Sequence, residues 1–422
     1  MPFMPFHILT IWLRGLLAIA LIGAGAYLLK FWYDHRYVEV RVDRPAAEVR
    51  VDPSTSEDRA DPRTPAPVVV RREPWQFGAN RETAALLGGL ALVALSIGGG
   101  SISYPLLRRA GGAEDDPDAS PRGEVRRHRR PDGTDLHVEL YGPEDGPTIV
   151  LTHGWGLDSR EWNYAKRHLA TGHRLIAWDL PGLGRSSQPA DRDYSLEKLA
   201  RDLDAVVGLA GGRPVTLVGH SIGGMINLTY CRLFPEALGT RVSGLIQVHT
   251  TYTNPVRTTG GAAFYTAVQK PLIEPLLHLT IALDPLAWLL NALSWLNGSA
   301  HRSTERSSFS GRETRGQLNF MARYTVKDRP AVLARGMLGM LRYDATETLG
   351  TIPVPALIVA GDRDRVTLTS ASVTMANTIP RATLLQLEPA RHGGHFEHHA
   401  RFAEAVRAFV AASAEAPRLQ PS

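Results

Sequence analysis

The serine at position 221 stands in a short pattern that could turn its hydroxyl into a nucleophile. Residues 219–223 read Gly-His-Ser-Ile-Gly, directly after an apolar run and directly before a helix-forming stretch. A sharp turn between a buried strand and a helix exposes the side chain at its apex, and Gly219 and Gly223 are needed because a Cβ would clash there. The helix also directs its N-terminal amides at the place where negative charge would develop. We therefore predict that Ser221 is a nucleophile, with an ordinary helix cap as the alternative.

A serine nucleophile needs a base, and the base needs a carboxylate that orients it. Two later segments offer these groups in the chain order serine, acid, histidine. One apolar run ends at a loop that carries Asp362 and Asp364, and the next ends at a loop that carries His392 and His395. Loops after neighbouring strands of a sheet could bring both groups to the serine.

Three more motifs accompany these candidates. Residues 153–155 read His-Gly-Trp and residues 179–186 read Asp-Leu-Pro-Gly-Leu-Gly-Arg-Ser, each after an apolar strand-like run, and residues 361–364 read Gly-Asp-Arg-Asp. With the serine turn and in this order, they make roughly residues 125–412 resemble the α/β hydrolase superfamily, in its lid-bearing serine esterase and lipase branch. The resemblance implies an α/β fold: a doubly wound, mostly parallel sheet with a helical lid insertion.

By this resemblance, Ser221 is the nucleophile, Asp364 the orienting acid and His395 the base. The backbone N–H groups of Trp155 and Ile222 would form the oxyanion hole. Serine rather than aspartate at the turn indicates acyl chemistry, in which an ester carbonyl is attacked and the acyl-serine intermediate is then hydrolysed. This chemistry needs no cofactor.

Neighbouring residues offer alternatives for two of these roles. Asp362 could replace Asp364, although a turn carboxylate is its simpler role, and His392 could replace His395, although the Gly-His-Phe sequence favours the latter. The histidines over 392–399 have no matching cysteine or carboxylate cluster, so we predict no metal site.

The composition is that of a globular protein with a surplus of arginine. Of 422 residues, 44% are hydrophobic, the formal net charge is +5, and the lone cysteine, Cys231, excludes an internal disulfide. The basic run 122–130 is better explained as a signal beside a membrane than as a nucleic-acid site, because no nucleic-acid-binding motif accompanies it.

Two apolar segments at about 8–33 and 83–107 precede the hydrolase-like region. Each is long enough to cross a bilayer, which takes about 20 residues. A signal peptide cleaved near Ala24-Gly25-Ala26 is the alternative for the first segment. We predict two retained transmembrane helices.

The loop over 34–82 separates these helices, and within it the runs 37–42 and 48–51 alternate like the strands of a hairpin. Two spans place both termini on one side of the membrane. Arg108 and Arg109, just after the second span, favour a cytoplasmic catalytic domain.

These segments define the expected domain organisation. We expect a membrane anchor over 1–110, a tether over 111–124, a hydrolase body over 125–248 and 351–415, and a helical lid over 249–350. An insertion as long as the last is far longer than an ordinary connection between two elements.

The lid is dense in leucine and carries Trp288, Leu289 and Trp295, which we expect to line an apolar acyl pocket. A third membrane segment over 276–296 is the alternative, weakened by Pro285. An anchored serine hydrolase with an apolar lid is expected to cleave lipid-like or other apolar carboxylic esters in the membrane.

The same three side chains also serve other activities. Perhydrolase or haloperoxidase-like activity, thioester hydrolysis and acyl transfer are the alternatives among enzymes. A membrane interaction protein that has kept the fold and lost catalysis is the alternative from a different class. It is disfavoured because candidates for all three catalytic residues are present.

Overall fold

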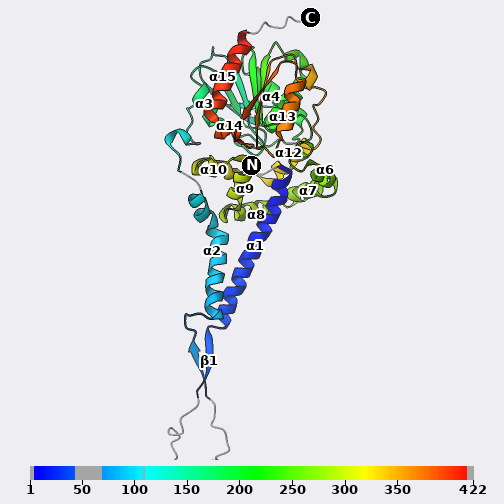
Figure 1. Ribbon diagram of the computed structural model, residues 1–422. Helices are drawn as coiled ribbons and strands as arrows, with labels where there is room; N and C mark the ends of the chain where they lie inside the picture. Colours follow the sequence, from blue (N-terminus) through cyan, green and yellow to red (C-terminus); the bar gives the residue numbers. More distant parts are fainter. Residues whose placement is uncertain (1–3, 43–68, 108–109, 416–422) are drawn as a thin grey trace, which may run out of the picture. The chain divides into compact units, whose positions relative to one another are not determined.

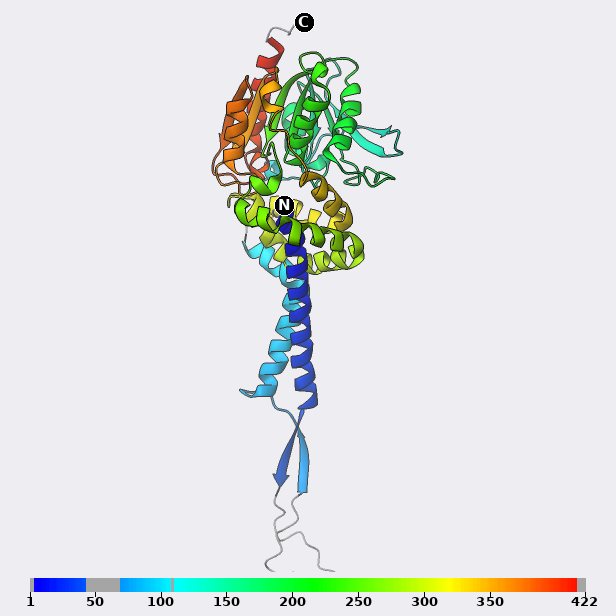
Figure 2. The same cartoon turned by 90° about the vertical axis from the view of Figure 1, so that its right-hand side faces the viewer.

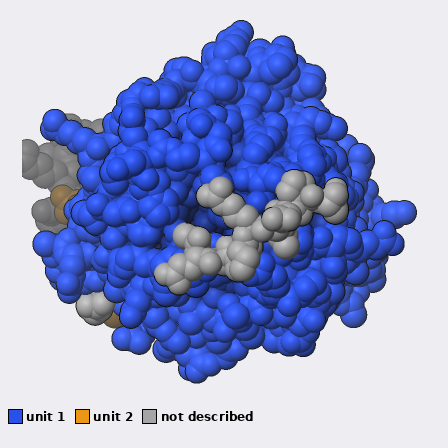
Figure 3. All heavy atoms as spheres, turned by 90° about the horizontal axis from the view of Figure 1, so that it is seen from above, with its two compact units in different colours: residues 1–16, 98–422 blue, residues 17–97 orange. Residues whose placement is uncertain are grey.

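The computed structural model describes residues 4–42, 69–107 and 110–415. The chain divides into two compact units, residues 1–16 with 98–422 and residues 17–97, coloured blue and orange in Figure 3. The first unit contains the sheet and the catalytic candidates. The second contains most of the two apolar helices.

The first unit is built on an eight-stranded sheet in the order β10-β9-β8-β7-β5-β6-β4-β3. The pair β3–β4 and the pair β4–β6 are antiparallel, and the remaining neighbours are parallel. The predicted doubly wound, mostly parallel sheet is therefore confirmed. The strands are β3 (Glu124–Arg129), β4 (Asp135–Tyr141), β5 (Thr148–Thr152), β6 (Arg174–Trp178), β7 (Val215–His220), β8 (Val242–Val248), β9 (Ala356–Gly361) and β10 (Ala382–Leu387).

Helices cover both faces of this sheet, because the parallel strands are apolar on both sides. One face packs against α3 and α15, and the other against α4, α5 and α13 (Figure 1). Their bounds are α3 (Asn163–Leu169), α4 (Leu196–Gly208), α5 (Ile222–Leu233), α13 (Thr369–Thr378) and α15 (His399–Glu415), and the short α14 (Gly394–Glu397) precedes the last of these.

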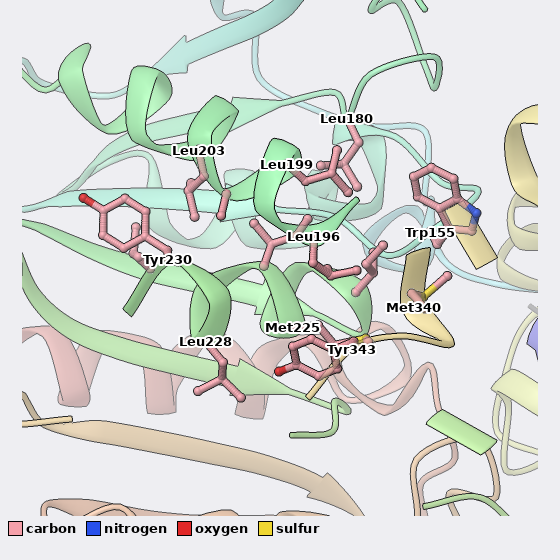
Figure 4. Close-up of a cluster of buried hydrophobic side chains, with 14 of the residues drawn as sticks. Trp155, Leu180, Leu196, Leu199, Leu203, Met225, Leu228, Tyr230, Met340 and Tyr343 are labelled. Carbon is pink, nitrogen blue, oxygen red and sulfur yellow. The ribbon is translucent and has the colours of Figure 1, made fainter. Parts of the chain in front are cut away.

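The larger hydrophobic core lies between the sheet and the α4–α5 side (Figure 4). Leu199 and Leu203 of α4 lie on the side of Tyr230 of α5, Leu228 lies on the other side of α5, and all four side chains are buried. Apolar residues at helical spacing on α4 and α5 therefore fix both helices, including the helix that follows the candidate nucleophile.

A helical insertion occupies the chain between β8 and β9, where the sequence analysis expects a lid. In Figure 2 these helices gather at one end of the body. They are α6 (Ala262–Val268), α7 (Glu274–Ala282), α8 (Asp284–Leu296), α9 (Ser299–Ser308), α10 (Arg315–Ala322), α11 (Tyr324–Lys327) and α12 (Pro330–Met340). An aromatic cluster joins this lid to the body, in which Phe320 of the lid stacks on Phe396 and Tyr164 meets the same ring edge-on.

The lid also contacts both apolar helices, at the ends of these helices that belong to the first unit. These helices are α1 (Met4–Asp34) and α2 (Arg81–Leu107). The indole N–H of Trp12 donates to the Thr280 hydroxyl at 3.0 Å, and a Cβ on Gly15 would lie 2.3 Å from Leu290. On α2, a Cβ on Gly100 would lie 2.8 Å from the Trp295 carbonyl.

Within the second unit, α1 and α2 approach each other closely. A Cβ on Gly25 would lie 3.1 Å from the Gly89 carbonyl oxygen, and one on Gly89 would lie 2.9 Å from the Gly25 carbonyl oxygen. Small residues permit such close packing between apolar helices, as they do in membranes.

The same unit holds a two-stranded ribbon that differs from the predicted hairpin. Strand β1 (Tyr37–Val42) pairs with β2 (Val69–Pro74), in antiparallel register from Tyr37 opposite Pro74 to Val42 opposite Val69. The run 48–51, proposed as the partner, lies outside the described residues. A partner this distant in sequence could not be read from a local pattern.

Two helical stretches, 10–34 and 81–101, are long and apolar enough to cross a membrane. The lid adds a bent pair, helices over 262–282 and 284–296 that meet at 99°, which counts as a third candidate only if the pair forms one broken span. Length and composition thus agree with the predicted anchor.

Helix α12 packs directly on the side chain of Trp155. A Cβ on Gly336 would lie 2.0 Å from the buried indole, and the Trp155 indole N–H donates to the Leu333 carbonyl at 3.1 Å. We predict that Gly336→Ala lowers the free energy of unfolding by about 1–3 kcal/mol, because neither the ring nor the helix has room to move. Chemical unfolding in detergent measures it.

The matched control is Gly350→Ala, since no atom lies within 4 Å of a Cβ there. That change is expected to stay within about 0.5 kcal/mol of the parent. Equal stability of the two variants would show that α12 does not pack on Trp155 as described.

Candidate active site

Ser221 occupies a strained turn between β7 and α5. Its φ of +52° lies in the left-handed region that side chains rarely adopt. A Cβ on Gly219 would lie 2.3 Å from Gly223, and one on Gly223 would lie 2.4 Å from the Thr152 carbonyl oxygen. The glycines are therefore required by close backbone approach, as the sequence analysis expects.

The histidine beside this serine is His392. Its Nε2 lies 3.1 Å from the Ser221 Oγ, and its Nδ1 lies 2.9 Å from Oδ2 of Asp364. With Nδ1–H donated to the carboxylate, Nε2 is free to accept the serine proton. The geometry is that of a nucleophile, a base and an orienting acid.

This arrangement corrects the choice of His395 as the base. His395 lies in α14 with its ring against Trp162 and its Nε2 3.2 Å from Glu161 Oε1. Gly393 and Gly394 do not leave His395 in a loop that could reach the serine. They instead begin a helix, and a Cβ on Gly394 would lie 2.8 Å from His249 Nε2.

The available signal for His392 was its place in the loop between β10 and α14. Only a residue in that connection stays at the end of the sheet, whereas a residue inside the following helix is carried into the packed interior. The sequence did not show where the helix begins.

The electrostatics suit an ionised acid and a neutral base. Burial raises the pKa of Asp364, but its attraction to His392 and its contacts with His392 and His249 outweigh that effect, so the pKa lies well below its usual range. Burial lowers the pKa of His392 despite its attraction to Asp364. His392 is therefore neutral at neutral pH, as a general base must be.

Asp364 is fixed by its own loop and by a further histidine. It accepts hydrogen bonds from the Val366 and Thr367 amides at 2.7 and 3.2 Å and from the Thr367 hydroxyl at 3.0 Å. His249 Nδ1 lies 3.5 Å from it. Asp362 accepts from the Ala390 amide at 2.7 Å instead, which agrees with a turn role.

A second buried carboxylate, Glu161, was not recognised in the sequence. Its Oε2 accepts from the Gly154 amide at 2.8 Å, and its Oε1 lies 2.5 Å from His220 Nδ1. His220 in turn contacts the His392 carbonyl oxygen through Nε2 at 3.1 Å. Glu161 thereby joins the His-Gly-Trp loop to the loop that carries the base, a connection with no signature in the local sequence.

Glu161, His220 and His395 place one ligand atom each within 4.8 Å of one another, close enough to hold a metal ion. All three are buried, and Glu161 and His220 are also committed to backbone groups of the two active-site loops. Burial lowers the pKa of His395 to about 4, and repulsion from His220 adds to this. We interpret the group as a network that positions the loops.

The amides of Trp155 and Ile222 are the ones expected to form the oxyanion hole. Trp155 and Ile222 are buried, and Ile222 is the first residue of α5, so its N–H has no acceptor within the helix. The Trp155 side chain is held by α12, as described above. Ile222 is thus fixed next to Ser221 at the start of α5, and Trp155 is fixed against α12.

The structure does not place the predicted pocket residues at the serine. Trp288 and Leu289 are 44% and 48% exposed on α8, and the Trp288 indole N–H donates to the Val326 carbonyl at 3.1 Å. Trp295 packs its ring on His301 within the lid, 4.3 Å between ring centroids. Leucine density predicted an apolar lid but could not tell which face points to solvent.

The part of the chain that contains this site is similar to known proteins. The sequence model of the alpha/beta hydrolase fold family matches residues 147–399. A pimeloyl-acyl-carrier-protein methyl ester esterase of Aeromonas salmonicida is 26% identical over 283 residues, covering 65% of this chain and 99% of that protein.

Solved structures show the same fold. An esterase of a Rhodococcus species has a TM-score of 0.56 at 24% identity, covering 68% of this chain and 98% of its own. A structure described as a membrane phospholipase A has a TM-score of 0.56 at 20% identity and covers 79% of this chain and 96% of its own.

The two histidines can be separated by mutation. We predict that His392→Ala lowers kcat on an activated ester by about 10⁴-fold or more, as removal of Ser221 does, because the base is lost. His395→Gln is expected to leave kcat within about tenfold and to lower stability instead, since it removes a buried contact to Glu161. Steady-state kinetics and thermal unfolding measure both effects.

Ser221→Ala provides the inactive reference. A loss in His395→Gln as large as that in His392→Ala would contradict the assignment of the base.

Proposed function

Because this chain belongs to the alpha/beta hydrolase fold family, we propose that it is a membrane-anchored serine hydrolase that cleaves carboxylic esters, in particular apolar or lipid-like acyl esters. The contact series from Ser221 through His392 to Asp364, with separations of 3.1 and 2.9 Å, carries this proposal. The methyl ester esterase among its relatives supports ester hydrolysis.

In the proposed cycle, the Ser221 oxygen attacks the ester carbonyl carbon while His392 Nε2 takes its proton. Asp364 keeps the imidazole oriented and stabilises the imidazolium that forms. The amides of Trp155 and Ile222 stabilise the oxyanion. His392 then protonates the departing alcohol, and next activates a water that releases the acid from the serine.

Two observations support lipid-like substrates and attachment to a membrane. Stretches 10–34 and 81–101 meet the length and hydropathy expected of membrane spans. The lid, which packs on the ends of α1 and α2 in its own unit, exposes large apolar side chains that include Phe264, Leu279 and Trp288. Exposed apolar side chains on the lid of a chain with candidate spans favour contact with lipid.

The basic segment at the start of the body bears on orientation. Strand β3 carries Arg126, Arg127 and Arg129 on an exposed surface shortly after α2. Basic residues next to a span favour the cytoplasmic side, so we propose a cytoplasmic catalytic domain.

The first test is hydrolysis of p-nitrophenyl esters from acetate to palmitate by the full chain in detergent. We expect kcat/KM to rise with acyl length and to fall by about 10⁴-fold or more in Ser221→Ala, because the nucleophile is lost. Activity confined to acetate would favour a small-ester or perhydrolase enzyme. Absence of serine-dependent turnover on every ester would contradict ester hydrolysis.

The exposed lid side chains make a second test. We predict that Trp288→Asp with Leu289→Asp lowers turnover of long-chain esters presented in vesicles, and leaves turnover of soluble acetate within about twofold, because charge weakens the lid's contact with lipid. Glu347→Gln, a polar change on an exposed residue outside the lid helices, is the control. Equal losses on both substrates would contradict a lipid-facing lid.

A further inference from the structure

An arginine-lined pocket opens beside the acid and base loops. It encloses about 300 Å³, and its lining includes Arg306 of α9, Arg363 and Arg365 of the acid loop, and Arg391 of the base loop. Tyr265 of α6 contributes to the same wall. Four arginines from three separate segments therefore line one open pocket.

Acidic side chains do not neutralise this pocket. Arg363 lies 3.4 Å from Asp362, but among the described residues no carboxylate comes within 4.0 Å of the guanidinium groups of Arg306, Arg365 or Arg391. The carboxylate of Asp364 is buried and committed to His392 and its own loop. The cavity keeps a surplus of positive charge, which concentrates anions.

The backbone of the pocket is held in place by hydrogen bonds. The Gly260 amide donates to the Arg365 carbonyl at 3.1 Å, and the Thr259 hydroxyl donates to the same oxygen at 3.0 Å. The Arg391 guanidinium donates to the carbonyl of Arg306, which joins the base loop to α9. Lid and body segments thus form one wall.

We propose that this pocket binds a phosphate group. Guanidinium groups recognise phosphate and carboxylate oxygens through paired N–H donors. A carboxylate has two oxygens, whereas cations converging from three segments suit the three or more outward oxygens of a phosphate. The phosphate belongs either to a lipid headgroup or to a soluble phosphoester, since both carry the same chemistry.

Three arginines of the pocket lie next to the proposed catalytic residues along the chain. Arg391 immediately precedes His392, and consecutive Cα atoms are about 3.8 Å apart. Arg363 and Arg365 flank Asp364 in the same way. A phosphate held here would lie beside the catalytic loops, so the proposed ester substrate would carry it next to the acyl group. This last step rests on the proposed esterase function, whereas phosphate binding itself does not.

The test measures binding, with the full chain in nonionic detergent and Ser221→Ala to prevent turnover. Inorganic phosphate is titrated by calorimetry at low ionic strength. We expect a dissociation constant near about 1 mM or tighter, and a weakening of about tenfold or more in Arg306→Gln with Arg365→Gln, because two charged contacts are lost. Thermal unfolding of the double variant tests whether it remains folded.

Arg302→Gln is the matched control, since Arg302 lies on the same helix but is paired with Glu305 at 3.0 Å and does not line the pocket. It is expected to bind phosphate like the parent. Phosphate binding that is absent, or unchanged in the double variant, would overturn the proposal.

Competition distinguishes the two sources of phosphate. Displacement by lysophosphatidic acid in micelles supports a lipid headgroup, and displacement by glycerol 3-phosphate alone supports a soluble phosphoester. Because binding is read without turnover, failure of ester hydrolysis leaves this result standing, and the reverse also holds.

Discussion

The active site depends on two buried carboxylates that must be satisfied by groups from different loops. Asp364 and Glu161 are each nearly inaccessible to water. An ionised carboxylate in such a place is costly unless it is hydrogen-bonded and paired. Asp364 therefore requires the base loop, and Glu161 requires both the His-Gly-Trp loop and His220. Folding cannot bury these charges without also assembling the site.

The site is also linked to the lid by direct contacts. Trp155, whose backbone amide we propose for the oxyanion hole, has its side chain fixed by Leu333 and Gly336 of α12. Arg391 joins the base loop to α9. A displacement of the lid would thus reach both the oxyanion side and the base side of the serine. The ends of α1 and α2 that belong to the same unit, with Trp12 and Gly100, also pack on this lid.

Local patterns predicted the elements that depend on local physics. Apolar runs bounded by turns located the parallel strands, and glycines at 219 and 223 located the strained serine because a tight turn excludes a Cβ. Apolar length located both long helices. The partner of β1 was missed, since it lies beyond a long connection and only pairing in space identifies it.

The sequence by itself determined the fold class, the serine turn and the presence of an acid and a histidine after it, because order along the chain and turn chemistry carry that information. Tertiary structure alone decided which histidine meets the serine. His392 and His395 are three residues apart, and the start of α14 between them leaves one at the end of the sheet and turns the other towards Glu161. The tertiary structure also brings four arginines from three segments to one pocket. The order of residues along the chain does not show which distant loops lie close together.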